Sequence, residues 1–196
     1  MGRPSLAEQR RSEILAAVGR CVARYGVAGT TLELVSSESG LSRGHIRHYL
    51  GNRDELILAF ADRVFEQGGY AMGEARAAAP AGGQSKAMLD ILFGPRWEPA
   101  EDNPAIDALL SAAATDEALA DRMRFAYLQI ESAMTKALRA DFPSAPAALC
   151  TQTAYALISM AFGNSTLSQL NFPANRRKGA RAMAEALLEQ VRNPEP

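Results

Sequence analysis

Residues 30–56, with the sequence TTLELVSSESGLSRGHIRHYLGNRDEL, constrain the fold of this chain more than any other segment. Thr30 and Glu33 stand three residues apart before an apolar pattern, which is the spacing of a capping box at a helix start. Gly40 can adopt the positive φ angle that ends a helix, and Ser42 is a typical N-cap for the next one. The segment therefore predicts two short helices joined by a tight turn, which is the helix-turn-helix arrangement.

The second of these helices separates an apolar face from a cationic one. Ile46 and Leu50 lie four residues apart, and so do Arg43 and Arg47. Gly44 inside a helix costs roughly 1 kcal/mol relative to Ala, and this cost makes sense where the backbone must approach another surface closely. In helix-turn-helix proteins that surface is the DNA major groove. We therefore predict that this helix reads DNA.

A third helix is predicted to begin at Asn52, which is spaced from Glu55 as in another capping box. Arg53 then falls in the first helical turn, where the helix dipole disfavours a cation. The free amides of a helix start are suited to a phosphate, and an arginine beside them strengthens such a site. We interpret Arg53 as a residue with an anionic partner.

Taken as a set, these residues resemble the DNA-binding domain of the TetR-type one-component transcriptional regulators. The matching positions are Gly26, Thr30-Thr31, Ser39-Gly40-Leu41-Ser42, Gly44, Tyr49-Leu50 and Arg53, within residues 8–60. Around His48 and Tyr49 the chain is most similar to the choline–betaine regulator branch. Arg47 stands where the family usually has Tyr, and Leu50 where it usually has Phe. The family's base contacts are therefore not carried over to position 47.

The resemblance implies an all-α protein of about nine helices, and no strand pattern opposes it. It places a helix-turn-helix DNA-binding domain at residues 1–55, a linking helix at about 52–76, and a helical effector-binding and dimerisation domain at 56–196. It also implies a homodimer that binds operator DNA, represses transcription and is released by a small molecule. No cofactor and no catalytic residue is expected.

We hypothesise two kinds of DNA contact. Phosphate contacts are assigned to Thr31, Tyr49 and Arg53, and base-edge contacts to the exposed face of the second helix, where either arginine suits a guanine. The full set of candidate DNA-binding residues is Thr31, Ser42, Arg43, Gly44, His45, Arg47, His48, Tyr49 and Arg53.

The remaining chain also reads as helical, with helices predicted at residues 84–93, 103–114, 115–140, 144–170 and 175–191. The last two are apolar on more than one side. A second copy of the chain is the expected cover, and a two-fold dimer would place two reading heads on successive turns of DNA. An intramolecular core is the alternative.

Aromatic residues and methionines among the middle helices, with a few polar groups, suit a cavity for a mostly apolar effector. At helical spacing such residues are more often plain core, so both readings stay open. The candidate ligand-binding residues are Met88, Phe93, Trp97, Met123, Phe125, Tyr127, Gln129, Tyr155, Ser159, Phe162 and Asn164.

Other classes of protein are less well supported by the sequence. It lacks a phosphate-binding loop, a His-Glu-x-x-His motif and a nucleophile elbow. His45 and His48 could share a metal, but we expect none because both fall on the predicted DNA-facing helix. No segment suits a membrane span, so we expect a cytoplasmic protein. The alternatives are an architectural DNA-binding protein without an effector, or a helical-bundle enzyme or binding protein.

Overall fold

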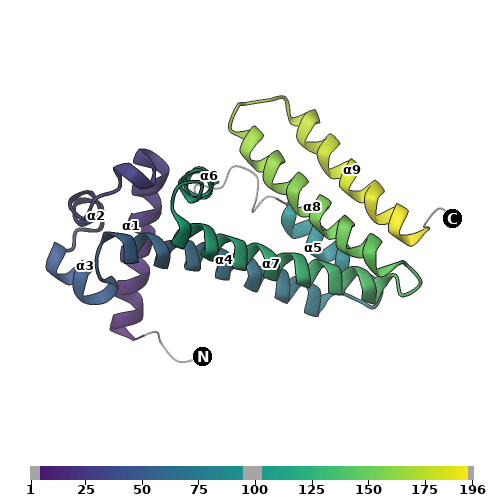
Figure 1. The fold of residues 1–196 in the computed structure, drawn as a ribbon, viewed down its shortest axis with the longest axis horizontal. Helices are drawn as coiled ribbons and strands as arrows, with labels where there is room; N and C mark the ends of the chain where they lie inside the picture. The colour runs from purple at the N-terminus through teal and green to yellow at the C-terminus, as the bar shows by residue number, and fades with distance from the viewer. Residues whose placement is uncertain (1–4, 95–102, 194–196) are drawn as a thin grey trace. The chain divides into compact units, whose positions relative to one another are not determined.

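The computed structural model describes residues 5–94 and 103–193, without the side chains of Asn103 and Ala174. Within these residues the chain forms nine α-helices and no β-strand (Figure 1), which confirms the predicted all-α fold. The helices are α1 (Leu6–Gly29), α2 (Leu32–Ser39), α3 (Arg43–Leu50), α4 (Arg53–Ala78), α5 (Gln84–Leu92), α6 (Asn103–Ala113), α7 (Glu117–Asp141), α8 (Ala147–Ser168) and α9 (Ala174–Arg192).

The junction between α1 and α2 differs from the prediction by one residue. Gly26 interrupts α1 with a φ of 70°, and the Thr30 hydroxyl donates a 2.8 Å hydrogen bond to its carbonyl. Thr30 therefore closes α1, and the N-cap of α2 is Thr31, whose hydroxyl accepts from the backbone N–H of Leu34 at 3.2 Å. The predicted capping box between Thr30 and Glu33 is wrong because Thr30 is already engaged with the preceding helix.

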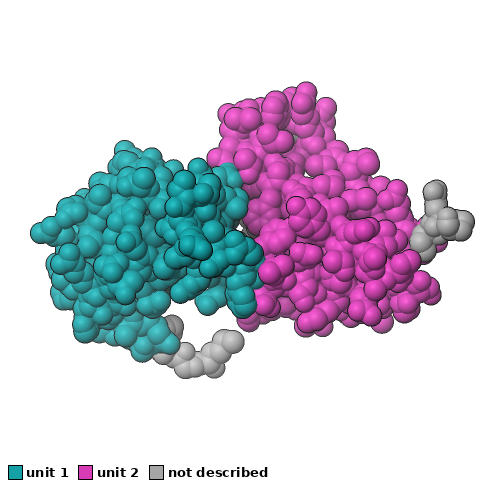
Figure 2. Space-filling model, viewed as in Figure 1, with its two compact units in different colours: residues 1–66, 101–125 teal, residues 67–100, 126–196 magenta. Residues whose placement is uncertain are grey.

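The described chain belongs to two compact units (Figure 2). Unit 1 comprises residues 1–66 and 101–125, and unit 2 comprises residues 67–100 and 126–196. Helices α4 and α7 each contribute to both units. Unit 1 is larger than the predicted DNA-binding domain because α6 packs against α1. The functional boundary near residue 55 stays a prediction.

The core of unit 1 lies around α1. Ile14, Val18 and Val22 are fully buried, together with Leu109 from α6. At Gly19 the ring of Phe60 comes so close that an added Cβ would lie 2.8 Å from its Cε2 atom. Glycine at this position therefore permits α1 and α4 to pack closely. Tight packing of this kind gives α2 and α3 a fixed support.

Polar contacts connect the helices of unit 1 at its surface. Arg122 at the start of α7 pairs with Asp62 on α4. Arg63, also on α4, donates a 2.9 Å hydrogen bond to the carbonyl of Ser12 on α1. Exposed ion pairs contribute little to stability on their own. They instead define which faces of α1, α4 and α7 meet.

Unit 2 is built on α8, which packs against α9 and α5. Cys150, Leu157 and Ile158 form its fully buried face. The Asp141 carboxylate at the end of α7 accepts hydrogen bonds from the first backbone amides of α5, including that of Ser85 at 2.7 Å, and so caps this helix. No helix among the described residues has the length and hydropathy needed to span a membrane.

Candidate nucleic-acid interface

Helices α2 and α3 are held on unit 1 by their apolar faces. Val35 is 1% exposed, Ile46 is fully buried and Leu50 is 7% exposed. Gly40 joins the helices with a φ of 69°, as predicted, and the Ser36 hydroxyl donates a 2.6 Å hydrogen bond to the carbonyl of Leu41. The turn between α2 and α3 is therefore held by the backbone conformation of Gly40 and by the side-chain hydrogen bond of Ser36. The face of α3 opposite Ile46 and Leu50 is exposed.

The start of α3 is capped by Ser42. Its hydroxyl accepts from the backbone N–H of His45 at 3.3 Å and lies 3.1 Å from the Nδ1 atom of the same residue. Ser42 and His45, both predicted to bind DNA, thus take part in capping the start of α3. Their contact with DNA stays a prediction.

The two predicted base-reading arginines differ in their surroundings. Arg43 forms a 2.6 Å ion pair with Glu33 on α2, and this hydrogen bond lowers the pKa of the Glu33 carboxyl below its ordinary value. Arg47 is exposed and its guanidinium has no hydrogen bond or ion pair with any described residue. Arg43 must leave Glu33 before it can bind a base, whereas Arg47 is already free. Arg47 is therefore the better candidate for a base contact.

The aromatic end of α3 is partly buried. The rings of His48 and Tyr49 meet edge to face, with centroids 5.1 Å apart. Tyr49 packs against the core of unit 1, and its carbonyl accepts a 3.3 Å hydrogen bond from Arg11. His48 is exposed beside Arg47. The contact fixes the imidazole next to the free arginine on one surface.

Arg53 makes contacts that the sequence did not indicate. Its Nε atom donates to the carbonyl of Thr30 at 2.9 Å, one terminal nitrogen donates to the carbonyl of Val27, and the other pairs with Asp54 at 2.7 Å. The Asn52 and Glu55 capping box beside it is present as predicted. The partners of Arg53 in the free protein are therefore two carbonyls and one carboxylate, and its phosphate contact stays a prediction.

The described part of the chain distributes the predicted effector-binding residues over both compact units, with Met123 and Phe125 in unit 1 and the others in unit 2. Met88 and Phe93 are buried at α5, while Met123 belongs to the core of unit 1. Phe125 is 66% exposed, and Gln129 and Ser159 are also exposed. Trp97 lies outside the described residues.

A smaller group of the predicted residues does meet between α7 and α8. The ring of Tyr127 lies 6.1 Å from that of Tyr155 and 6.4 Å from that of Phe162. Burial raises the pKa of the Tyr127 hydroxyl, against a smaller opposite effect of Ser159. This buried hydroxyl makes no hydrogen bond within the described chain. The hydroxyl thus lies beside two other rings and is influenced by the Ser159 side chain.

Asn164 lines a different pocket, one that the sequence reasoning missed. This pocket has a volume of about 350 Å³ and lies between α8 and the start of α9. Its lining residues are Met160, Gly163, Asn164, Leu167, Ser168, Phe172, Arg176, Arg177 and Ala180. The available signal was the run of three cations at residues 176–178, which begins three residues after Pro173. Within the described chain no three metal-ligating side chains gather in one place.

Comparison with known proteins finds similar regulators for part of the chain and a similar fold for nearly all of it. No protein-family model matches the chain. The chain is 38% identical over 60 residues to the HTH-type transcriptional regulator PksA of Bacillus subtilis, a segment that covers 31% of this chain and 29% of PksA. It is 42% identical over 53 residues to the repressor AcnR of Corynebacterium jeikeium, covering 27% and 28% of the two chains. It is 33% identical over 86 residues to the regulator BetI of Paraburkholderia xenovorans, covering 44% of each.

Solved structures match over nearly the whole chain. A TetR transcription regulator from Haloarcula marismortui superimposes with a TM-score of 0.80 at 20% identity, covering 93% of this chain and 98% of that one. A TetR-family regulator from Cytophaga hutchinsonii gives a TM-score of 0.80 at 16% identity, covering 99% and 100%. The chain has the fold of the TetR family.

The TetR-family fold agrees with the resemblance read from residues 26–53. The curated relatives share less than half of their length with this chain, so their activities do not transfer directly. They are described as transcriptional regulators or repressors and not as enzymes. BetI is one of several relatives that match less than half of this chain, so the predicted choline–betaine regulator branch stays a prediction.

Gly44 allows a test that separates stability from DNA binding. An added Cβ would meet only the Ser42 hydroxyl, at 3.8 Å, which is ordinary contact. Gly44→Ala should therefore stabilise α3 by up to about 1 kcal/mol. The same methyl would stand on the exposed surface that is predicted to face DNA, so we expect weaker DNA binding despite a higher Tm. Thermal unfolding and DNA titration of the same preparation check both halves, and unchanged DNA affinity would show that the α3 backbone stays clear of DNA.

Proposed function

We propose that this chain is a sequence-specific DNA-binding transcriptional regulator that reads the major groove through α3. The observation that carries the proposal is the division of α3 into a buried apolar face, with Ile46 and Leu50, and an exposed face that holds Arg47 without a partner in the described chain. A free guanidinium on a rigidly supported helix is the group that suits the O6 and N7 atoms of guanine. The TetR-family fold of the described chain supports the same function.

The proposed regulator acts as a homodimer through α8 and α9. Several large apolar side chains are exposed on these helices or on the turn between them, among them Tyr155 at 58% and Met183 at 60% exposure. Val191, near the end of α9, is instead buried in unit 2. Large exposed apolar side chains on two packed helices are typical of a protein–protein interface. A two-fold axis there gives two copies of α3 and hence a palindromic operator.

Release by a small molecule is the proposed mode of regulation, with repression as the outcome. Helices α4 and α7 both continue from unit 2 into unit 1, so a change within unit 2 has two covalent routes to the helix-turn-helix. Coupling free energies between two such sites are typically about 1–3 kcal/mol, which gives release of roughly 5- to 150-fold. The competing proposal is an architectural protein without an effector.

The experiment that tests the function is selection of bound sites from random duplex DNA at two salt concentrations. Enrichment of a palindrome with half-sites about one helical turn apart is the expected result for a dimeric reader. Binding that depends on salt but enriches no sequence would contradict sequence-specific reading.

Replacing Arg47 with Ala should cost about 1–3 kcal/mol of binding free energy on the selected operator and much less on random DNA. The reason is that a base contact is lost, whereas contacts to the phosphates remain. Fluorescence anisotropy on both DNAs measures the difference. Arg24→Ala, which removes an exposed arginine of α1 outside the candidate interface, is the matched control. Equal losses on operator and random DNA would assign Arg47 to the backbone instead.

A further inference from the structure

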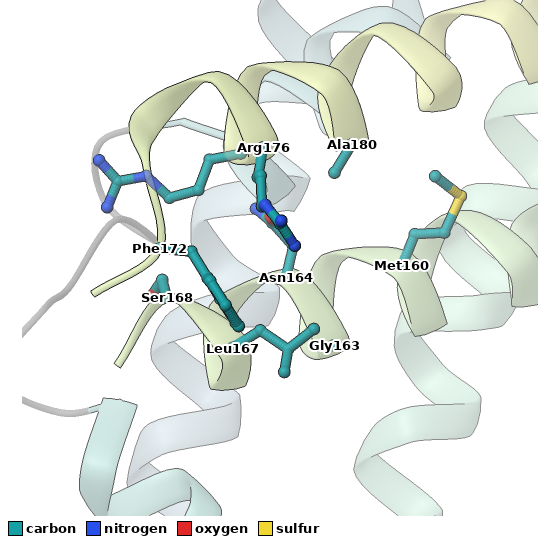
Figure 3. A pocket seen from close by; sticks show the side chains of 9 residues that line it. Met160, Gly163, Asn164, Leu167, Ser168, Phe172, Arg176 and Ala180 are labelled. Atoms are coloured by element: carbon teal, nitrogen blue, oxygen red, sulfur yellow. The ribbon is translucent and has the colours of Figure 1, made fainter. Parts of the chain in front are cut away.

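The pocket between α8 and the start of α9 combines an apolar wall with unpaired cations. Figure 3 shows Met160, Asn164 and Leu167 along α8, opposite Arg176 and Ala180 on α9, with Phe172 from the connecting turn between the helices. The guanidinium carbon of Arg176 lies 5.0 Å from the centre of the Phe172 ring. This pocket shares only Asn164 with the effector site predicted from the sequence.

The cations of this pocket lack the partners that arginines of the same unit have elsewhere. Arg181, one turn further along α9, pairs with Asp90 and Glu185, and Arg192 pairs with Glu189. Neither Arg176 nor Arg177 forms an ion pair with a described residue, and the Nε atom of Arg177 is buried without a hydrogen-bond partner. A buried polar group of this kind is costly unless something binds it.

The local backbone adds to the positive potential. Helix α9 has no acidic residue in its first turn, and its N-cap, Pro173, provides no side-chain cap. The positive end of the helix dipole therefore coincides with two arginines that line the pocket, an arrangement that is unfavourable without an anion. Leu167, Met160 and the Phe172 ring offer apolar surface directly beside these charges.

We propose that the α8–α9 pocket binds an apolar molecule that carries one anionic group, a carboxylate or a phosphate. The anionic group binds Arg176 and Arg177, and the apolar part lies along Met160, Gly163 and Leu167. The charged group supplies the orientation and the apolar part supplies contact area, as in other small-molecule sites. This proposal rests on the effector-dependent function proposed above. Its test measures ligand binding by the chain without DNA, so ligand binding can fail while DNA binding holds, and the reverse.

The test is calorimetric titration of the full chain with decanoate, decyl phosphate and decanol, each below its micelle concentration. We expect saturable binding of at least one anion and binding of decanol at least tenfold weaker. The tighter of the two anions identifies the headgroup. Absence of saturable binding by both anions, or decanol binding as tightly as the anions, would overturn the proposal.

Three charge variants and, after them, two glycine variants locate the site. Arg176→Gln and Arg177→Gln should each raise the Kd of the anion about tenfold, the size of a lost charge-assisted hydrogen bond. Lys178→Gln removes the same charge from the same turn outside the pocket lining and should leave Kd unchanged. An equally large rise in Kd for Lys178→Gln would contradict the proposal, because it would mean that the positive charge of the helix start attracts anions without a defined binding site.

The two glycine variants test the apolar wall of the pocket. Gly163 has open space where a side chain would project, so Gly163→Leu should fill the pocket and abolish binding without a clash. Gly179→Leu makes the same change on α9, also into open space but outside the pocket lining. Binding that survives Gly163→Leu, or that is lost equally in both variants, would refute this location. Circular dichroism of all five variants checks that they are folded.

Discussion

Replacing Ile46 with Ala is expected to destabilise unit 1 by about 2–5 kcal/mol, the usual cost of emptying a fully buried aliphatic position. Ile46 is 0% exposed, and α3 is an eight-residue helix. Such a short helix is not stable by itself, so its position depends on the few side chains that it buries. Urea unfolding followed by circular dichroism measures the loss. DNA binding should fall for every sequence alike, since the whole reading helix loses its support.

Ile46→Val and His48→Ala are the matched controls for this prediction. The first removes one methyl group and should cost about 0.5–1.5 kcal/mol. The second truncates an exposed side chain of the same helix and should change stability by no more than about 0.5 kcal/mol. If Ile46→Ala cost no more than Ile46→Val, α3 would be positioned by its turn and caps rather than by its buried face.

The parts of the interface that the sequence predicted correctly are those determined by local backbone chemistry. Gly40 has the positive φ angle expected of it, and Ser42 caps α3 as expected. Each of these depends only on residues within one turn of the helix. The error at Thr30 has the opposite origin, because its hydroxyl binds the carbonyl of Gly26, and the non-helical φ and ψ angles of that glycine are not visible in a capping pattern.

Contacts between different helices were beyond the reach of the sequence. Glu33 and Arg43 are ten residues apart, and their pairing requires the α2–α3 turn to be folded. The contrast between a paired Arg43 and a free Arg47 therefore appears only in three dimensions. The same limit applies to the predicted effector residues, since apolar residues at helical spacing look alike whether they fill a core, as Met123 does, or face solvent, as Phe125 does.

Arg53→Ala is expected to destabilise unit 1 by about 2–4 kcal/mol, because a guanidinium that bonds two carbonyls is removed. Hydrogen bonds to charged groups contribute about 1.5–3 kcal/mol each, reduced here by partial exposure. Val27 retains a second donor, the backbone N–H of Thr30, but the carbonyl of buried Thr30 has no other hydrogen bond within the described chain. Urea unfolding measures the effect. Arg53→Lys keeps the positive charge but lacks the planar guanidinium that reaches both carbonyls at once. It should therefore lose most of the same stability.

DNA-binding measurements with Arg53→Ala then distinguish a phosphate contact of Arg53 from a structural role within unit 1. Both a phosphate contact and a structural contact predict weaker binding to all DNA, so affinity alone does not distinguish them. A phosphate contact predicts a salt slope reduced by about one, with the fold intact. A structural contact predicts reduced stability and an unchanged slope whenever the protein is folded. We expect the second result, because the nitrogens of Arg53 are already bound to Thr30, Val27 and Asp54. A reduced slope would mean that Arg53 exchanges one of these partners for a phosphate when DNA binds.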